Sequence, residues 1–73
     1  MAKDNDDVVR TEMLRMLMGK VAEDAYPSAT MLDMIESLLK PDEVPAYAEL
    51  LMQKIRRDRF PSIPLMNRIL ELT

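Results

Sequence analysis

Few residues of this chain carry the groups that enzymes use for catalysis. The chain holds no His and no Cys, which removes the commonest general base and the strongest thiol nucleophile. Ser28 and Ser62 supply hydroxyls, but each follows a proline at an expected helix start, where Ser favours helix capping. The neighbouring carboxylates at positions 23–24 and 42–43 fall at expected helix ends. We therefore expect a non-enzymatic protein with no catalytic residue and no cofactor.

Metal and phosphate binding are equally poorly supplied. The acidic cluster Asp4, Asp6 and Asp7 lacks the ligand offsets and the turn glycine of a calcium loop. Gly19 is the only glycine, and one glycine cannot build a phosphate-binding loop. We expect no bound metal, and we interpret the cluster as the acidic first turn of a helix.

Four of the ten cationic side chains form one short run, Lys54, Arg56, Arg57 and Arg59. Residues 1–43 hold ten acids and five bases, whereas residues 44–73 hold five bases and three acids. Such a run fits docking on an acidic protein surface or contact with nucleic-acid phosphates. A helix C-terminus also favours bases through its dipole alone. The candidate partner-binding residues are Lys54, Arg56, Arg57, Arg59 and Arg68.

The apolar residues recur at helical spacing, and no alternating strand pattern is present. Prolines and short polar residues divide the chain into four expected helices, near 6–24, 28–39, 43–58 and 62–72, with residues 1–5 frayed. The expected N-caps are Ser28, Asp42 and Ser62. In the first helix one apolar face is expected to carry Val9, Met13, Met16, Leu17 and Val21, widened by Leu14 and Met18.

A repeat with an offset of 34 residues relates the two halves of the chain. Leu17, Met18, Lys20, Asp24, Pro27 and Ser28 recur identically as Leu51, Met52, Lys54, Asp58, Pro61 and Ser62. Tyr26 and Phe60 occupy equivalent places at the turns. The sequence therefore predicts an all-α fold of two tandem helix–turn–helix hairpins, about 6–39 and 43–72, packed as a small bundle.

The length of 73 residues predicts a single helical domain with a small core and no disulfide to reinforce it. Charges interrupt every apolar stretch, so no membrane span and no signal peptide is expected, and the expected location is the cytoplasm. Hydrophobic residues make up 48% of the chain and include eight methionines, which suit adaptable surfaces.

These observations favour a small protein-interaction or regulatory module that binds a larger protein partner, with homodimerisation as one way to cover surplus apolar surface. A first alternative is a helix–turn–helix nucleic-acid binder acting through the Lys54–Arg59 run, whose binding would weaken steeply with salt. A second alternative is a structural subunit of an assembly.

Overall fold

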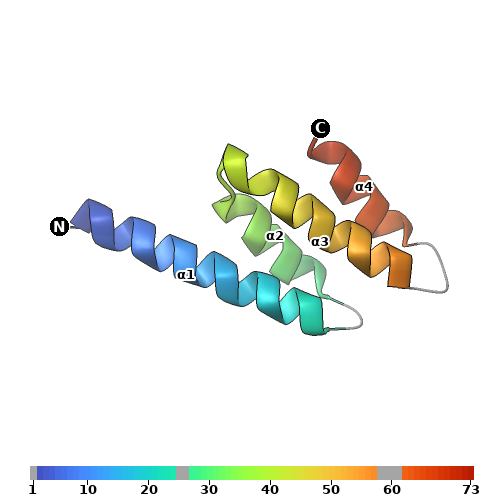
Figure 1. Cartoon of the computed structure of the whole chain (residues 1–73), viewed down its shortest axis with the longest axis horizontal. Helices are drawn as coiled ribbons and strands as arrows, with labels where there is room; N and C mark the ends of the chain where they lie inside the picture. The colour runs from blue at the N-terminus through green and yellow to red at the C-terminus, as the bar shows by residue number, and fades with distance from the viewer. Residues whose placement is uncertain (1, 25–26, 58–61) are drawn as a thin grey trace. The chain divides into compact units, whose positions relative to one another are not determined.

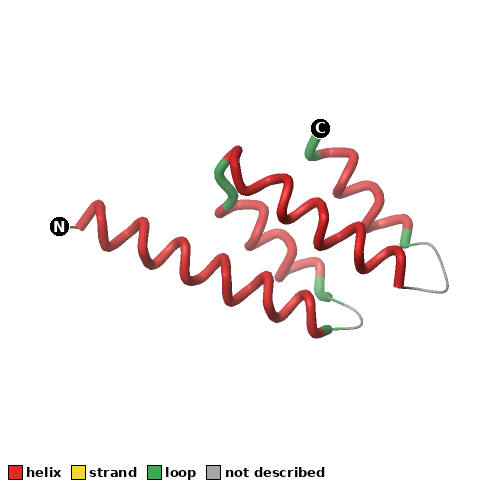
Figure 2. Tube along the Cα trace, viewed as in Figure 1, coloured by secondary structure: helices red, strands yellow, loops and turns green. Residues whose placement is uncertain are grey.

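The chain folds into α-helices joined by short connections. The computed structural model describes residues 2–24, 27–57 and 62–73, and it describes side chains from Asp7 onward. The elements are α1 (Ala2–Glu23), α2 (Ala29–Leu38), the 3₁₀ turn η1 (Pro41–Glu43), α3 (Val44–Arg57) and α4 (Ile63–Glu71). Within these ranges no strand is present (Figure 2), so the expected all-α class with four helices is confirmed.

Two compact units divide the chain, Met1–Leu39 and Lys40–Thr73. In the first unit α1 packs beside α2, and in the second α3 packs beside α4 (Figure 1). Each unit is thus a helical hairpin, as the sequence predicts. The turn residues Tyr26, Phe60 and Pro61 lie outside the described residues.

Serine side chains cap the second helix of each unit. The Ser28 Oγ accepts a hydrogen bond from the Met31 amide at 3.1 Å, and the Ser62 Oγ accepts one from the Leu65 amide at 3.4 Å. Each bond satisfies an amide that a helix start leaves without an intrahelical acceptor. Pro64 follows in the first turn of α4, where no amide donor is needed.

The start of the third helical segment differs from the expected cap at Asp42. Asp42 lies in the middle of η1, and the Glu43 carboxylate does the capping, because its Oε1 accepts from the Lys40 amide at 2.9 Å. The Glu43 amide in turn donates to the Lys40 carbonyl at 2.8 Å. Pro41 has its φ fixed near the helical value, which explains why the turn begins there, ahead of Asp42.

Helix α1 begins at Ala2, earlier than the expected start near position 6. No proline or glycine interrupts positions 2–5, and acidic residues are favourable in a first turn. The helix ends at Glu23, and the amide of Asp24 still donates to the Lys20 carbonyl at 3.0 Å.

The buried apolar residues of the first unit come from one stripe on each helix. These residues are Leu14, Leu17 and Val21 on α1 and Leu32 and Ile35 on α2. The expected α1 face was partly wrong, because Val9 is 66% exposed and Met16 is 53% exposed. On α1, the buried line and the line of Val9 and Met16 both have helical spacing. Because α1 packs against one neighbouring helix, it buries only one of these two lines.

Arg10 joins the first half of α1 to the end of α2. Its Nη1 donates a hydrogen bond to the Leu38 carbonyl at 2.9 Å, and its Nε lies 3.5 Å from the Asp7 Oδ1. The last carbonyls of a helix have no intrahelical donor and carry the negative end of its dipole. A half-buried guanidinium therefore satisfies this helix end both as a donor and as a charge.

Replacing Arg10 by Ala is expected to lower the free energy of unfolding by roughly 1–2 kcal/mol, because it removes a charge-assisted bond and leaves a carbonyl unsatisfied. Urea denaturation followed by circular dichroism measures this loss. Arg15→Ala is the matched control, since the Arg15–Glu12 pair at 2.9 Å joins exposed side chains. Such a pair contributes less than about 1 kcal/mol. Equal losses for the two variants would contradict a tertiary role for Arg10.

In the second unit the buried stripe of α3 consists of Tyr47, Leu51 and Lys54. These positions are four and three residues apart, so they share one side of the helix. Tyr47 and Leu51 have no exposed surface, and Leu65 is the buried residue of α4. An ionisable side chain thus occupies a position on the buried side of α3.

Candidate interaction surfaces

Lys54 does not belong to an exposed basic surface. Only 8% of the residue is accessible, and it continues the line of Tyr47 and Leu51. Lys54 therefore presents little accessible surface, and its contact with a partner stays a prediction. A lysine buries its aliphatic stem readily, which allows this placement within a mostly apolar stripe.

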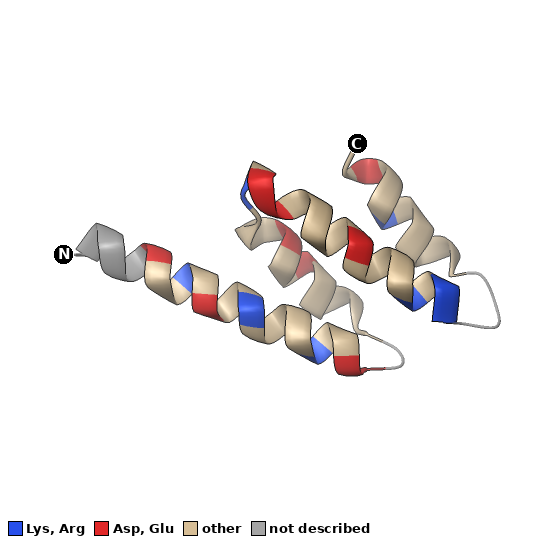
Figure 3. Cartoon of the chain, in the orientation of Figure 1, with Lys and Arg blue, Asp and Glu red and all other residues tan. Residues whose placement is uncertain are grey.

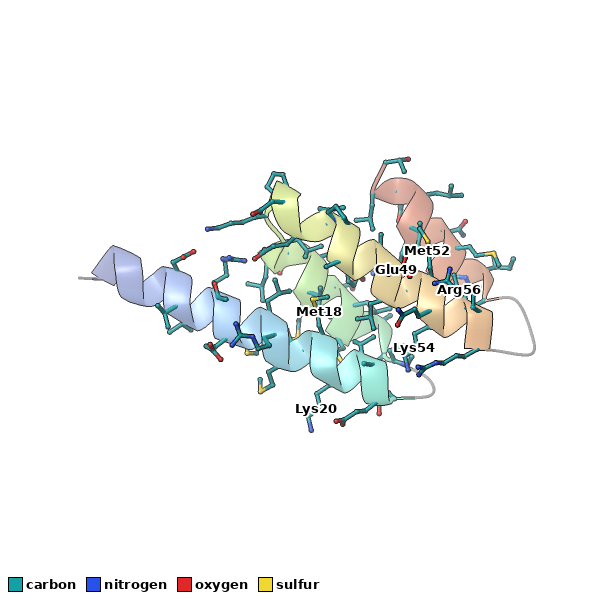
Figure 4. All side chains as sticks on the ribbon, in the orientation of Figure 1. Met18, Lys20, Glu49, Met52, Lys54 and Arg56 are labelled. Carbon is teal, nitrogen blue, oxygen red and sulfur yellow. The ribbon has the colours of Figure 1, made fainter. Side chains whose placement is uncertain are left out.

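Arg56 is engaged within its own helix. Its Nη2 lies 2.7 Å from the Glu49 Oε1, and both side chains are more than half exposed (Figure 4). The two residues are seven positions apart, so the pair spans two turns along one side of α3. The acidic partner at Glu49 offsets the positive charge that Arg56 presents to solvent.

The remaining described basic residues of the second unit lie on two helices and near its start. Arg57 is exposed at the end of α3, and Arg68 is half-buried on α4. Blue marks the end of α3 in Figure 3. Successive helix positions point about 100° apart, so Arg57 lies on the side of Lys54, three positions before it, whereas Arg56 faces another direction. Arg59 lies outside the described residues.

The two halves of the repeat differ at one matching lysine. Leu17 and Leu51 are both buried, whereas Lys20 is exposed and Lys54 is buried. In Figure 4 the Lys20 side chain extends away from α1. The internal repeat itself remains a prediction from the sequence.

An exposed apolar line of the first unit runs along α1 beside its buried stripe. We define the α1 outer stripe as Val9, Met13 and Met16, which are spaced by four and three residues. Val9 is 66% exposed, Met16 is 53% exposed and Met13 is half-buried. Sequence reasoning placed all three on one apolar face with Leu17 and Val21, and it did not say which part of that face is buried.

Gly19 stands one turn beyond Met16, on an exposed part of α1. A Cβ built at this position meets no atom within 4 Å, and the described glycine has no positive φ. Neither close packing nor backbone conformation within the described chain therefore calls for glycine. A glycine inside a helix nevertheless costs about 0.5–1 kcal/mol relative to alanine.

Other exposed apolar side chains lie on α2, on α4 and elsewhere on α1. Met34 is 40% exposed on α2, and Val8 is 60% exposed on α1. On α4, Ile63 and Leu70 are 58% and 67% exposed and lie seven positions apart. Isolated exposed apolar residues are ordinary on protein surfaces. The α1 outer stripe joins two such residues, Val9 and Met16, through the half-buried Met13, and the half-buried Met66 joins Ile63 and Leu70 on α4 in the same way.

Sites of other kinds find little support. The described side chains include no group of three or more acidic, His or Cys residues placed to hold one metal ion. None of the helices in the described part of the chain has the length and apolar character needed to cross a bilayer. Comparison with known proteins gives no further guidance, because no protein family, no curated protein and no solved structure matches this chain.

Proposed function

We propose that this chain is a non-enzymatic protein-interaction module that binds a larger protein partner through the α1 outer stripe. The observation that carries the proposal is the exposure of Val9 and Met16 on a helix that already buries Leu14, Leu17 and Val21. The proposal includes a cytoplasmic location, with which a chain free of cysteine is compatible.

The chemistry of the stripe supports protein docking. Exposed contiguous apolar surface favours association with another protein. Methionine is flexible and polarizable, so it adapts to the shape of a facing surface. Gly19 adds a position without a side chain beside Met16, which permits a partner backbone to approach α1 closely.

The basic residues are assigned a smaller part in this proposal. Lys54 is buried and Arg56 is paired with Glu49, so neither offers an unopposed surface charge. Arg57 is exposed and contributes at most to long-range attraction of an acidic partner. Such attraction changes the association rate and its salt dependence more than the affinity.

Met16→Gln tests the proposal, with Met34→Gln as the matched control on α2. Gln keeps the side-chain length and helix propensity but removes the apolar end group. We expect Met16→Gln to weaken binding of the captured partner about tenfold, as truncation of an interface anchor does. Met34→Gln should leave it within about twofold. Titration calorimetry with the partner recovered by the unmodified chain measures both.

The solution mass of the chain across a concentration series decides whether that partner is a second copy. If the chain dimerises, Met16→Gln should raise the dimer dissociation constant while Met34→Gln does not. If Met16→Gln and Met34→Gln changed the dissociation constant equally in either experiment, the α1 outer stripe would not be the docking surface. Binding that is insensitive to both variants yet falls steeply with salt would instead favour the nucleic-acid alternative.

Gly19→Ala is expected to stabilise the fold and to weaken docking. Alanine has a higher helix propensity and meets no neighbour here, so the free energy of unfolding should rise by about 0.5–1 kcal/mol. The added methyl group should hinder a partner that packs closely on α1. Thermal melting and the binding titration measure the two effects.

A lower melting temperature for Gly19→Ala would mean that the fold itself needs the glycine. A higher melting temperature with unchanged affinity would place the docking surface away from Gly19. Ala22→Gly, at an exposed position on the same helix, is the reciprocal control. It should destabilise α1 by a similar amount without affecting docking.

A further inference from the structure

The α1 outer stripe exposes one methionine in particular. Met16 is 53% exposed, and Met34 is the next most exposed described methionine at 40%. Met13, Met18, Met31, Met52 and Met66 are all half-buried. Hydroperoxides reach an exposed thioether more readily than one that is covered by neighbouring side chains.

The surroundings of Met16 leave its oxidation compatible with an intact fold. Met16 lies outside the stripe of Leu14, Leu17 and Val21 that α1 buries. One turn before it, Glu12 is engaged with Arg15 at 2.9 Å, and one turn after it Lys20 is exposed. A polar oxygen added to the sulfur is therefore accommodated by solvent.

We propose that Met16 is a site of reversible oxidation by hydroperoxides, and that its sulfoxide blocks docking on the α1 outer stripe. The second half of this inference rests on the proposed function. The sulfur lone pair attacks the terminal oxygen of the hydroperoxide, the O–O bond breaks, and an S–O bond forms. Sulfur loses two electrons, the peroxide is reduced, and the hydroperoxide proton leaves with the alcohol or water produced.

The sulfoxide converts the exposed end of the stripe from apolar to polar. Val9 and Met13 then remain as an apolar pair without their outer neighbour. Docking and oxidation exclude each other, because a partner seated on the stripe covers the Met16 sulfur. Methionine sulfoxide reductases reverse the reaction and restore the apolar surface.

The first experiment needs no partner. The whole chain is treated with hydrogen peroxide, in buffer and in concentrated guanidinium chloride, and each methionine is followed by peptide mass mapping. We expect the Met16 rate in buffer to lie within about twofold of its rate in denaturant. The rates of Met18, Met52 and Met66 should be slowed about threefold or more by folding. A Met16 rate slowed as much as theirs would overturn the modification site.

The second experiment measures the consequence by retention on a hydrophobic-interaction column. Peroxide treatment should shorten the retention of the native chain, and reductase treatment should restore it, with helicity unchanged throughout. Met16→Leu should keep most of its retention under peroxide, whereas Met34→Leu should behave as the unmodified chain does. Loss of helicity on selective Met16 oxidation, or equal shifts for the two variants, would contradict the surface role.

The two proposals fail in different ways. Selective Met16 oxidation combined with unchanged partner affinity of the oxidised chain would overturn the block of docking and keep the modification site. If, in addition, Met16→Gln left the partner affinity unchanged, the docking surface itself would be overturned. Slow oxidation of Met16 with a strong Met16→Gln effect would remove the redox inference alone.

Discussion

Ile35→Ala lowers the free energy of unfolding by about 2–5 kcal/mol, as expected for a buried aliphatic residue whose removal leaves a cavity. Ile35 has no exposed surface and lies on the buried side of α2 with Leu32. A domain of this length has a total stability of only about 4–11 kcal/mol. The melting temperature of the variant should therefore fall to near body temperature, which thermal melts followed by circular dichroism measure.

Met34→Ala provides the control for Ile35→Ala on the same helix. Met34 precedes Ile35 directly but is 40% exposed, so its truncation should cost less than about 1 kcal/mol. Leu51→Ala extends the comparison to the second unit, where an equally buried side chain should give a loss of the same size. A small loss for both core variants would mean that these positions tolerate a cavity by collapse.

Lys54→Glu should destabilise the chain by roughly 2–4 kcal/mol, because it places a carboxylate at a site with 8% exposure. The carboxylate also lacks the long stem with which lysine carries its charge toward solvent. Arg57→Glu changes the net charge by the same amount at an exposed position three residues later on α3. It should change stability by less than about 0.5 kcal/mol.

Urea denaturation of both variants at two salt concentrations tests this contrast. Salt should reduce any effect of Arg57→Glu, since exposed charges are screened, and should leave most of the Lys54→Glu loss in place. Equal, salt-sensitive losses of unfolding free energy for the two variants would mean that Lys54 is exposed. The continuous basic run that the sequence suggested would then be supported.

Local signals in the sequence predicted the helix boundaries better than the surfaces. A Pro-Ser step at Ser28 has a mechanism confined to neighbouring residues, and the structure shows the Ser28 hydroxyl on the Met31 amide. Asp42 was misplaced because Pro41 starts a 3₁₀ turn ahead of it and brings Glu43 within reach of the Lys40 amide. Competing caps differ by one or two positions, which composition does not resolve.

Which apolar and charged side chains are buried depends on tertiary packing, which local sequence patterns do not show. Met16 and Leu17 are adjacent and both apolar, yet only Leu17 is buried, because the choice depends on where α2 packs. The sequence did not predict the role of Arg10, because its acceptor, the Leu38 carbonyl, lies 28 positions away. Lys54 was expected at the surface on charge alone, although its spacing from Tyr47 and Leu51 already placed it on their side of the helix.

The bond between Arg10 and the Leu38 carbonyl also bears on how the first unit opens. It lies at the end of the hairpin opposite the connection between α1 and α2, where the separation of two paired helices ordinarily begins. Fraying of the last turn of α2 therefore requires release of a side chain that belongs to α1. Removal of the Arg10 side chain is therefore expected to speed the exchange of backbone hydrogens in the last turn of α2, 28 residues away in the chain.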